Sequence, residues 1–168
     1  MFYSRIFSLC ILLFSCTAAQ ANLTTAQLAV WANEAIVTTY TYSYENFIQQ
    51  QKAIALYFTP KGWIAYSKAF QDAKLQNSIV ENKYLVSAVA TLPPTIKTIG
   101  NQQWQATMPL LVSYKNTQYQ QKQTLNVTIQ FTAVADGGVR GLAITNLQAK
   151  ASADPCQCKN EERYKAIV

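Results

Sequence analysis

The sequence predicts an α+β domain, with helices from the first half of the chain packed on one antiparallel sheet of about four strands. Up to about Lys83, apolar residues recur every three to four positions, which is typical of helices. Beyond Lys83 they recur at every second position, which is typical of strands with one buried face. Helices followed by such strands fit an α+β layer arrangement.

Residues 1–21 have the pattern of a signal peptide. Arg5 precedes an apolar run over residues 6–16, and Ala19-Gln20-Ala21 then matches the small-x-small pattern of a signal-peptidase site. The run is shorter than the roughly 20 apolar residues that a membrane-spanning helix needs. We therefore expect cleavage between Ala21 and Asn22, and a protein that is periplasmic or secreted.

A lipoprotein is the alternative interpretation of this leader. Leu13-Phe14-Ser15-Cys16 resembles a lipobox, in which Cys16 would become the lipidated first residue, although Phe14 is bulky for that motif. Without lipidation, membrane association would occur only through partners.

Residues 22–151 are long enough for one domain, and composition restricts what it binds. The chain has 14 basic and 8 acidic residues, a net charge of +6, and the basic residues are scattered. Nucleic-acid binding needs a basic patch, so we expect none. Only 13% of residues are charged, and a surface of amides and hydroxyls suits packing against other proteins.

Capping patterns predict where the helices begin. Thr24 and Gln27 form a capping box before a helix, which we expect to continue through Tyr40–Tyr44 to near Asn46. A second helix should cover residues 47–57.

Thr59-Pro60 predicts a sharp start of a third helix, whose aromatic face comprises Trp63, Tyr66 and Phe70. Ser78 and Glu81 are expected to cap one further turn.

The strands follow from alternation. Residues 84–90 form one strand, which Leu92-Pro93-Pro94 ends or bends. Residues 104–114 form the next, where Pro109 lies on the opposite parity from the apolar residues and predicts a bulge or an edge position. Residues 125–133 and 140–149 form the last two strands, joined at Asp136-Gly137-Gly138, which is a hairpin signal.

Several segments together resemble the DotI/IcmL family of type IVB secretion systems, whose conjugative relative is TraM. Their order and spacing make the resemblance fairly specific, and it extends over roughly residues 35–149. The segments are Tyr57-Phe58-Thr59-Pro60 with Gly62, Trp63 and Tyr66; Val86–Thr91 with Pro93 and Pro94; Trp104 with Met108-Pro109-Leu110-Leu111-Val112 and Tyr114; and Arg140-Gly141-Leu142.

The resemblance implies a cone-shaped periplasmic domain with a curved sheet, similar to nuclear transport factor 2. It also implies a structural part of an inner-membrane secretion complex that catalyses no reaction and binds other protein subunits. Family members have a retained membrane helix before this domain, whereas the leader of this chain has the pattern of a cleavable signal.

The residue inventory disfavours an enzyme. The chain has no histidine, the commonest general base and metal ligand, and no cofactor motif. Glu34, Glu45 and Asp72 are expected on the solvated surface. If the cone has a pocket, tyrosines are its candidate lining, although core or rim packing is the simpler expectation for them; these are Tyr57, Tyr66, Tyr84 and Tyr114.

Residues 152–168 are polar and are expected to be a flexible tail containing Cys156 and Cys158. Two thiols one residue apart are weak candidates for a soft-metal site or a reducible disulfide.

The sequence therefore predicts a non-catalytic assembly component or accessory of a type IVB secretion or conjugation apparatus. It would act by contacts with other protein subunits or with copies of itself in a homo-oligomer. The alternatives are a free-standing periplasmic or secreted ligand-binding module of the same fold, or a thiol or metal accessory using Cys156 and Cys158.

Overall fold

The computed structural model describes residues 23–152, so the expected signal peptide and the tail with its two cysteines lie outside the described residues. Four helices come from the first half of this part. They are α1 (Thr25–Thr39), α2 (Phe47–Ala55), α3 (Pro60–Asp72) and α4 (Leu75–Glu81). None of them is long and apolar enough to cross a lipid bilayer.

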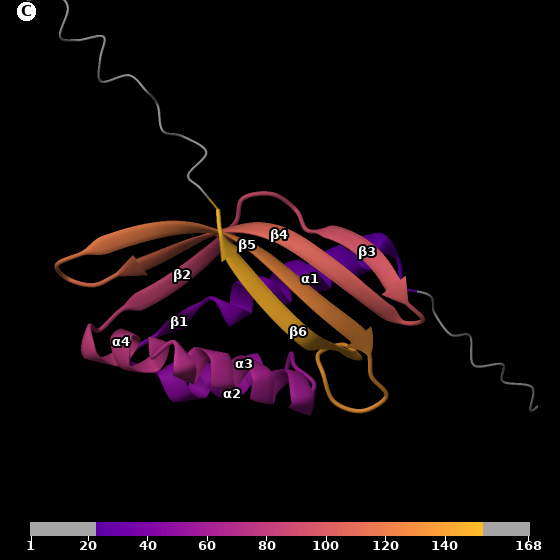
Figure 1. The fold of residues 1–168 in the computed structure, drawn as a ribbon, viewed down its shortest axis with the longest axis horizontal. Coiled ribbons are helices and arrows are strands. Elements are labelled where there is room, and N and C mark those ends of the chain that lie inside the picture. Colours follow the sequence, from indigo (N-terminus) through magenta and orange to yellow (C-terminus); the bar gives the residue numbers. More distant parts are fainter. Residues whose placement is uncertain (1–22, 153–168) are drawn as a thin grey trace, which may run out of the picture.

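In the described part of the chain, six strands form one antiparallel sheet in the order β1-β2-β4-β5-β6, and β3 pairs with the same edge of β4 as β2 does. The strands are β1 (Tyr42–Ser43), β2 (Leu85–Ala90), β3 (Thr95–Gly100), β4 (Gln103–Lys115), β5 (Gln120–Ala133) and β6 (Leu142–Ala151). The sheet curls around α1, while α2, α3 and α4 lie beyond α1 on the same side (Figure 1). The α+β class and the curved sheet are confirmed, and residues 23–152 contain six strands rather than about four.

The first extra strand lies where a helix was expected to continue. The α1 helix ends at Thr39, and Tyr42 pairs with Val86 of β2. Because Tyr40, Tyr42 and Tyr44 alternate with other residues, they follow the period of a strand, and pairing with β2 outweighs helix propagation there.

The helix starts agree with the capping patterns. The Thr24 hydroxyl accepts a hydrogen bond from the amide of Gln27, whose side chain in turn accepts from the Thr24 amide. The Thr59 hydroxyl accepts from the amide of Gly62 at 3.1 Å, with Pro60 as the first helical residue. The prediction for Ser78 and Glu81 is wrong, because both lie inside α4, which begins three residues before Ser78.

The prediction that Pro109 marks an edge or a bulge is also wrong. The β4 strand lies between β5 and the pair β2 and β3, and its register with β5 is regular through Pro109. The strand pairing is interrupted instead along the opposite edge of β4. There, β2 and β3 flank the segment that contains Pro93 and Pro94. The carbonyl of Pro109 points toward this break and accepts a hydrogen bond from the amide of Thr91. The nitrogen of Pro109, which carries no hydrogen, points to the same side, where the hydrogen-bond ladder is interrupted.

The core lies between α1 and the concave face of the sheet. On α1 the side chains of Trp31 and Ile36 are buried. On β4 and β5 the buried residues lie on one face, as the alternation predicted; they include Ala106, Met108, Leu110 and Val112 on β4 and Val127, Ile129 and Phe131 on β5. The β6 strand departs from this alternation, because Leu142, Ala143 and Ile144 are all buried.

Candidate functional site

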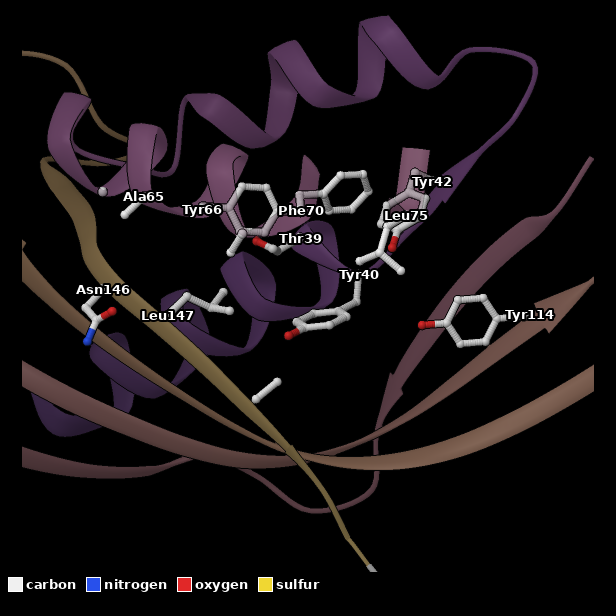
Figure 2. Close-up of a pocket in the computed structure, with 13 residues that line it drawn as sticks. Thr39, Tyr40, Tyr42, Ala65, Tyr66, Phe70, Leu75, Tyr114, Asn146 and Leu147 are labelled. Carbon is white, nitrogen blue, oxygen red and sulfur yellow. The ribbon is translucent and has the colours of Figure 1, made fainter. Parts of the chain in front are cut away.

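A pocket opens between α3, the end of α1 and the concave side of the sheet. Its volume is about 410 Å³. Tyr40 in the turn after α1, Tyr66 on α3 and Tyr114 on β4 line this space (Figure 2). The remaining lining is mostly apolar; it consists of Thr39, Tyr42, Gly62, Ala65, Ala69, Phe70, Leu75, Asn146, Leu147 and Ala149.

Aromatic packing fixes the wall formed by α3. The rings of Tyr66 and Phe70 lie 5.8 Å apart, and Phe70 meets Tyr42 edge-on at 5.9 Å. Trp63 extends the row, with its ring 5.4 Å from that of Tyr66. The spacing of three and four residues along α3 therefore produces one continuous aromatic surface, as the sequence predicted.

The pocket is uncharged at neutral pH. Burial is the main cause that raises the pKa of Tyr40, Tyr42, Tyr66 and Tyr114 above the ordinary value of 10.0 for a phenol. Neighbouring phenols add to the effect at Tyr40 and Tyr42. All four hydroxyls therefore remain protonated and can donate hydrogen bonds.

These residues suit binding better than proton transfer. Among residues 23–152, no carboxylate, lysine or arginine lines the pocket, and the chain has no histidine. A phenol with a raised pKa is a poor general base near neutral pH. The chemistry available is the burial of an apolar group together with hydrogen bonds from phenols.

The sequence identified this lining only in part. Tyr66 and Tyr114 line the pocket, whereas Tyr57 and Tyr84 do not. Tyr40 and Tyr42 were missed because they were assigned to a helix, although their alternation was a signal for the strand that brings them here. No sequence signal pointed to Asn146 and Leu147, which reach the pocket through the pairing of β6.

The Tyr57–Gly62 motif lies beside the pocket, where it joins α2, α3 and β6. The amide of Ile144 donates to the carbonyl of Tyr57 at 2.7 Å, and the amide of Thr59 donates to the carbonyl of Ile144 at 2.9 Å. Phe58 thus bridges to Ile144 of β6. Gly62 approaches the same carbonyl so closely that an added Cβ would lie 2.5 Å from it. These motif residues attach the helical layer to the sheet.

Glu34 is solvent-accessible, as expected, with a side chain that is 42% exposed, but it also links two motif residues. The hydroxyl of Tyr57 donates to Glu34 Oε1 at 2.6 Å, and the guanidinium of Arg140 forms an ion pair with Glu34 Oε2. The hydrogen bond from Tyr57 and then that from Arg140 lower the pKa of Glu34. Burial and the bond to Glu34 raise the pKa of Tyr57.

The remaining motif residues are also placed in the framework. Trp104 packs on Phe131 at a ring distance of 5.6 Å, and Met108 is fully buried. Gly141 has φ +72°, and its carbonyl accepts from the amide of Val134. Of the residues quoted for the family motif, only Gly62, Tyr66 and Tyr114 line the pocket.

The described residues contain no group of three or more potential metal ligands among histidine, cysteine and carboxylates. Cys156 and Cys158 lie beyond Ser152 and outside the described part.

A family model described as "Type-IV b secretion system, inner-membrane complex component" (DotI and IcmL) matches residues 14–151. The chain belongs to this family. An IcmL-like type IV secretion system protein from Legionella pneumophila is 54% identical, with a TM-score of 0.78; the match covers 82% of this chain and 99% of that one. The periplasmic domain of DotI is 27% identical, with a TM-score of 0.74, over 79% of this chain and 99% of that domain. No curated protein matches the chain.

The fold extends beyond the DotI/IcmL family. A nuclear transport factor 2-like superfamily protein from Salmonella enterica has a TM-score of 0.55 at 12% identity, over 81% of this chain and 99% of that one. At this identity the likeness concerns the fold alone. It confirms the expected similarity to nuclear transport factor 2.

Proposed function

We propose that this protein is a non-catalytic periplasmic assembly component or accessory of a type IVB secretion or conjugation apparatus, and that it acts by contacts with other protein subunits. The observation that supports this most is family membership over residues 14–151, combined with the likeness to the periplasmic domain of DotI. The geometry agrees with a scaffold, because the motif residues serve the framework and the pocket has no acid–base pair.

The test is deletion of the gene in its own host, followed by measurement of effector or plasmid transfer. We expect transfer to fall and to be restored by the gene in trans. Normal transfer after deletion, in a strain without a second copy of the family, would contradict the proposal. Crosslinked envelopes should also yield other subunits of the apparatus together with this protein, or a homo-oligomer of it.

The proposed compartment requires export. We propose that residues 1–21 are removed as a signal peptide and that residues 22–151 form the periplasmic domain. Sequencing the N-terminus of the protein recovered from cells should give Asn22. Recovery of a lipidated Cys16, or of an intact leader, would contradict this cleavage.

A ligand-binding module is a second candidate function, and the pocket of about 410 Å³ is the observation that favours it. The neutral, phenol-lined surface would suit an uncharged, largely apolar ligand. Substituting Ala65, an exposed residue of the lining, by Trp would fill the opening without removing a core side chain. If transfer survives deletion but a ligand extracted with the wild-type protein is lost in Ala65→Trp, the binding module is favoured over the assembly role.

A further inference from the structure

The outer face of the sheet is left uncovered by the helices. All four helices lie on the concave side (Figure 1). Along β4, Ala106, Met108, Leu110 and Val112 are buried against them, so the alternate residues point outward. Most of these outward side chains are amides and hydroxyls.

The charges on the outer face all have one sign. Strands β2 to β6 contain four lysines and no aspartate or glutamate. Their register places the four lysines on the outward parity, and each is exposed; they are Lys97, Lys115, Lys122 and Lys150. None of them forms an ion pair in the part of the chain that the structure describes.

Two of these lysines are close neighbours. Lys122 lies opposite Ser113, and Lys115 follows Ser113 by two residues, so Lys115 and Lys122 are diagonal neighbours on one face. Such pairs have Cα atoms roughly 7–8 Å apart, and like charges close together on a sheet face are unfavourable. An anionic group placed between them would relieve this repulsion.

The carboxylates lie elsewhere in the described range 23–152. Glu34, Asp72 and Glu81 belong to helices, Glu45 precedes α2, and Asp136 lies in the loop before β6. The outer face of the sheet therefore attracts anionic groups, and no acidic residue on its own strands pairs with the lysines in their place.

We propose that this outer face is a docking surface for an acidic protein surface, an inference that rests on the assembly role proposed above. Exposed apolar side chains on and after β2 extend the face, as protein interfaces require; Leu85, Val89 and Leu92 are 48%, 62% and 64% exposed. A bilayer is the less fitting occupant, because recognition of anionic lipid headgroups uses clusters of about 4–8 basic residues, whereas only Lys115 and Lys122 are close neighbours on this face.

The proposal is tested by reversing the charge of lysines on the outer face. The protein used is the one purified after export. The probe is a decaglutamate peptide, and binding is followed by amide chemical shifts. We expect shifts around Lys115 and Lys122 that weaken when salt shortens the Debye length. The double variant Lys115→Glu/Lys122→Glu should weaken binding by roughly tenfold or more, because two attractions become repulsions.

The matched control is Lys52→Glu/Lys74→Glu, which changes the net charge equally but lies on the helical side. Retained peptide binding in the control supports the outer face. Equal loss in both variants would mean that only net charge matters and would overturn the proposal, as would absence of binding by the wild-type protein. Sedimentation with phosphatidylglycerol vesicles but no peptide binding would assign the face to a membrane and also overturn it.

Complementation of the deletion strain separates this inference from the proposed function. If deletion abolishes transfer and Lys115→Glu/Lys122→Glu restores it fully at normal protein level, the assembly role stands and the docking face is wrong. Failure of this variant to restore transfer, with success of Lys52→Glu/Lys74→Glu, supports both. If deletion has no effect on transfer, the assembly role itself fails.

Discussion

Gly62 shows at the scale of one residue why this position requires the smallest side chain. An added Cβ would lie 2.5 Å from the carbonyl oxygen of Ile144, which is a backbone atom and already accepts from the amide of Thr59. The backbone of β6 cannot yield without breaking that bond. The glycine therefore allows α3 to approach the sheet closely.

We expect Gly62→Ala to reduce the free energy of unfolding by about 1–3 kcal/mol, the usual cost of overpacking. Urea denaturation measures it. Gly100→Ala is the matched control, because its Cβ would meet only the flexible side chain of Gln103, at 3.2 Å. A loss no larger at Gly62 than at Gly100 would contradict the role of close approach.

Glu34 is a single residue that makes the stability of the fold depend on pH. Its pKa is lowered in the folded state from the ordinary value of 4.5, first by the hydrogen bond from Tyr57 and then by that from Arg140. A carboxyl group with a lowered folded pKa stabilises the fold above its unfolded pKa, and this contribution is lost as the pH falls through the folded pKa.

Thermal unfolding between pH 7 and pH 3 should therefore show a smaller decline in Tm for Glu34→Gln than for the wild type. Glu81→Gln removes an exposed carboxylate that forms no ion pair among residues 23–152, and it should follow the wild-type curve. Identical curves for wild type and Glu34→Gln would show that the bonds to Tyr57 and Arg140 do not persist in solution.

At the scale of elements, the start of α3 is a joint between a helix and a strand. The hydroxyl of Thr59 caps the helix through Gly62, while its amide binds the carbonyl of Ile144. The Thr-Pro pair thus has a local role, which the sequence indicates, and a long-range role, which it does not.

Thr59→Ala should cost about 1 kcal/mol of unfolding free energy through loss of the cap. Thr59→Ser keeps the hydroxyl and should recover most of that loss, as measured by chemical denaturation. If serine proves no better than alanine, the side-chain cap is not what stabilises this helix start.

The whole molecule depends on one helix enclosed by one curved sheet. The α1 helix contacts β2, β3, β4 and β5, and the core is continuous between α1 and these strands. Helix and sheet should therefore unfold together in a single transition.

Ile36→Ala removes a fully buried side chain from the last turn of α1 and should cost about 2–5 kcal/mol. Far-UV circular dichroism and tryptophan fluorescence should shift to the same new midpoint. Val30→Ala on the same helix, where the side chain is 62% exposed, should change little. Separate midpoints for the two probes would contradict a single cooperative unit.

Local patterns in the sequence were enough to determine that helices precede the main strands, the caps at Thr24 and Thr59, and the inward parity of the long strands. Period, capping chemistry and burial of one face are properties of neighbouring residues, so they can be read without the fold. The family resemblance likewise followed from short segments in order.

Only the tertiary structure decided the features that depend on distant contacts. The β3 strand is exposed along most of its length, so it lacks the alternation that would have revealed it. The pairing of Glu34 with Arg140 joins residues 106 positions apart, and the pocket needs β6 beside α3. Closure of the sheet around α1 sets these distances, and that closure results from the packing of the whole core.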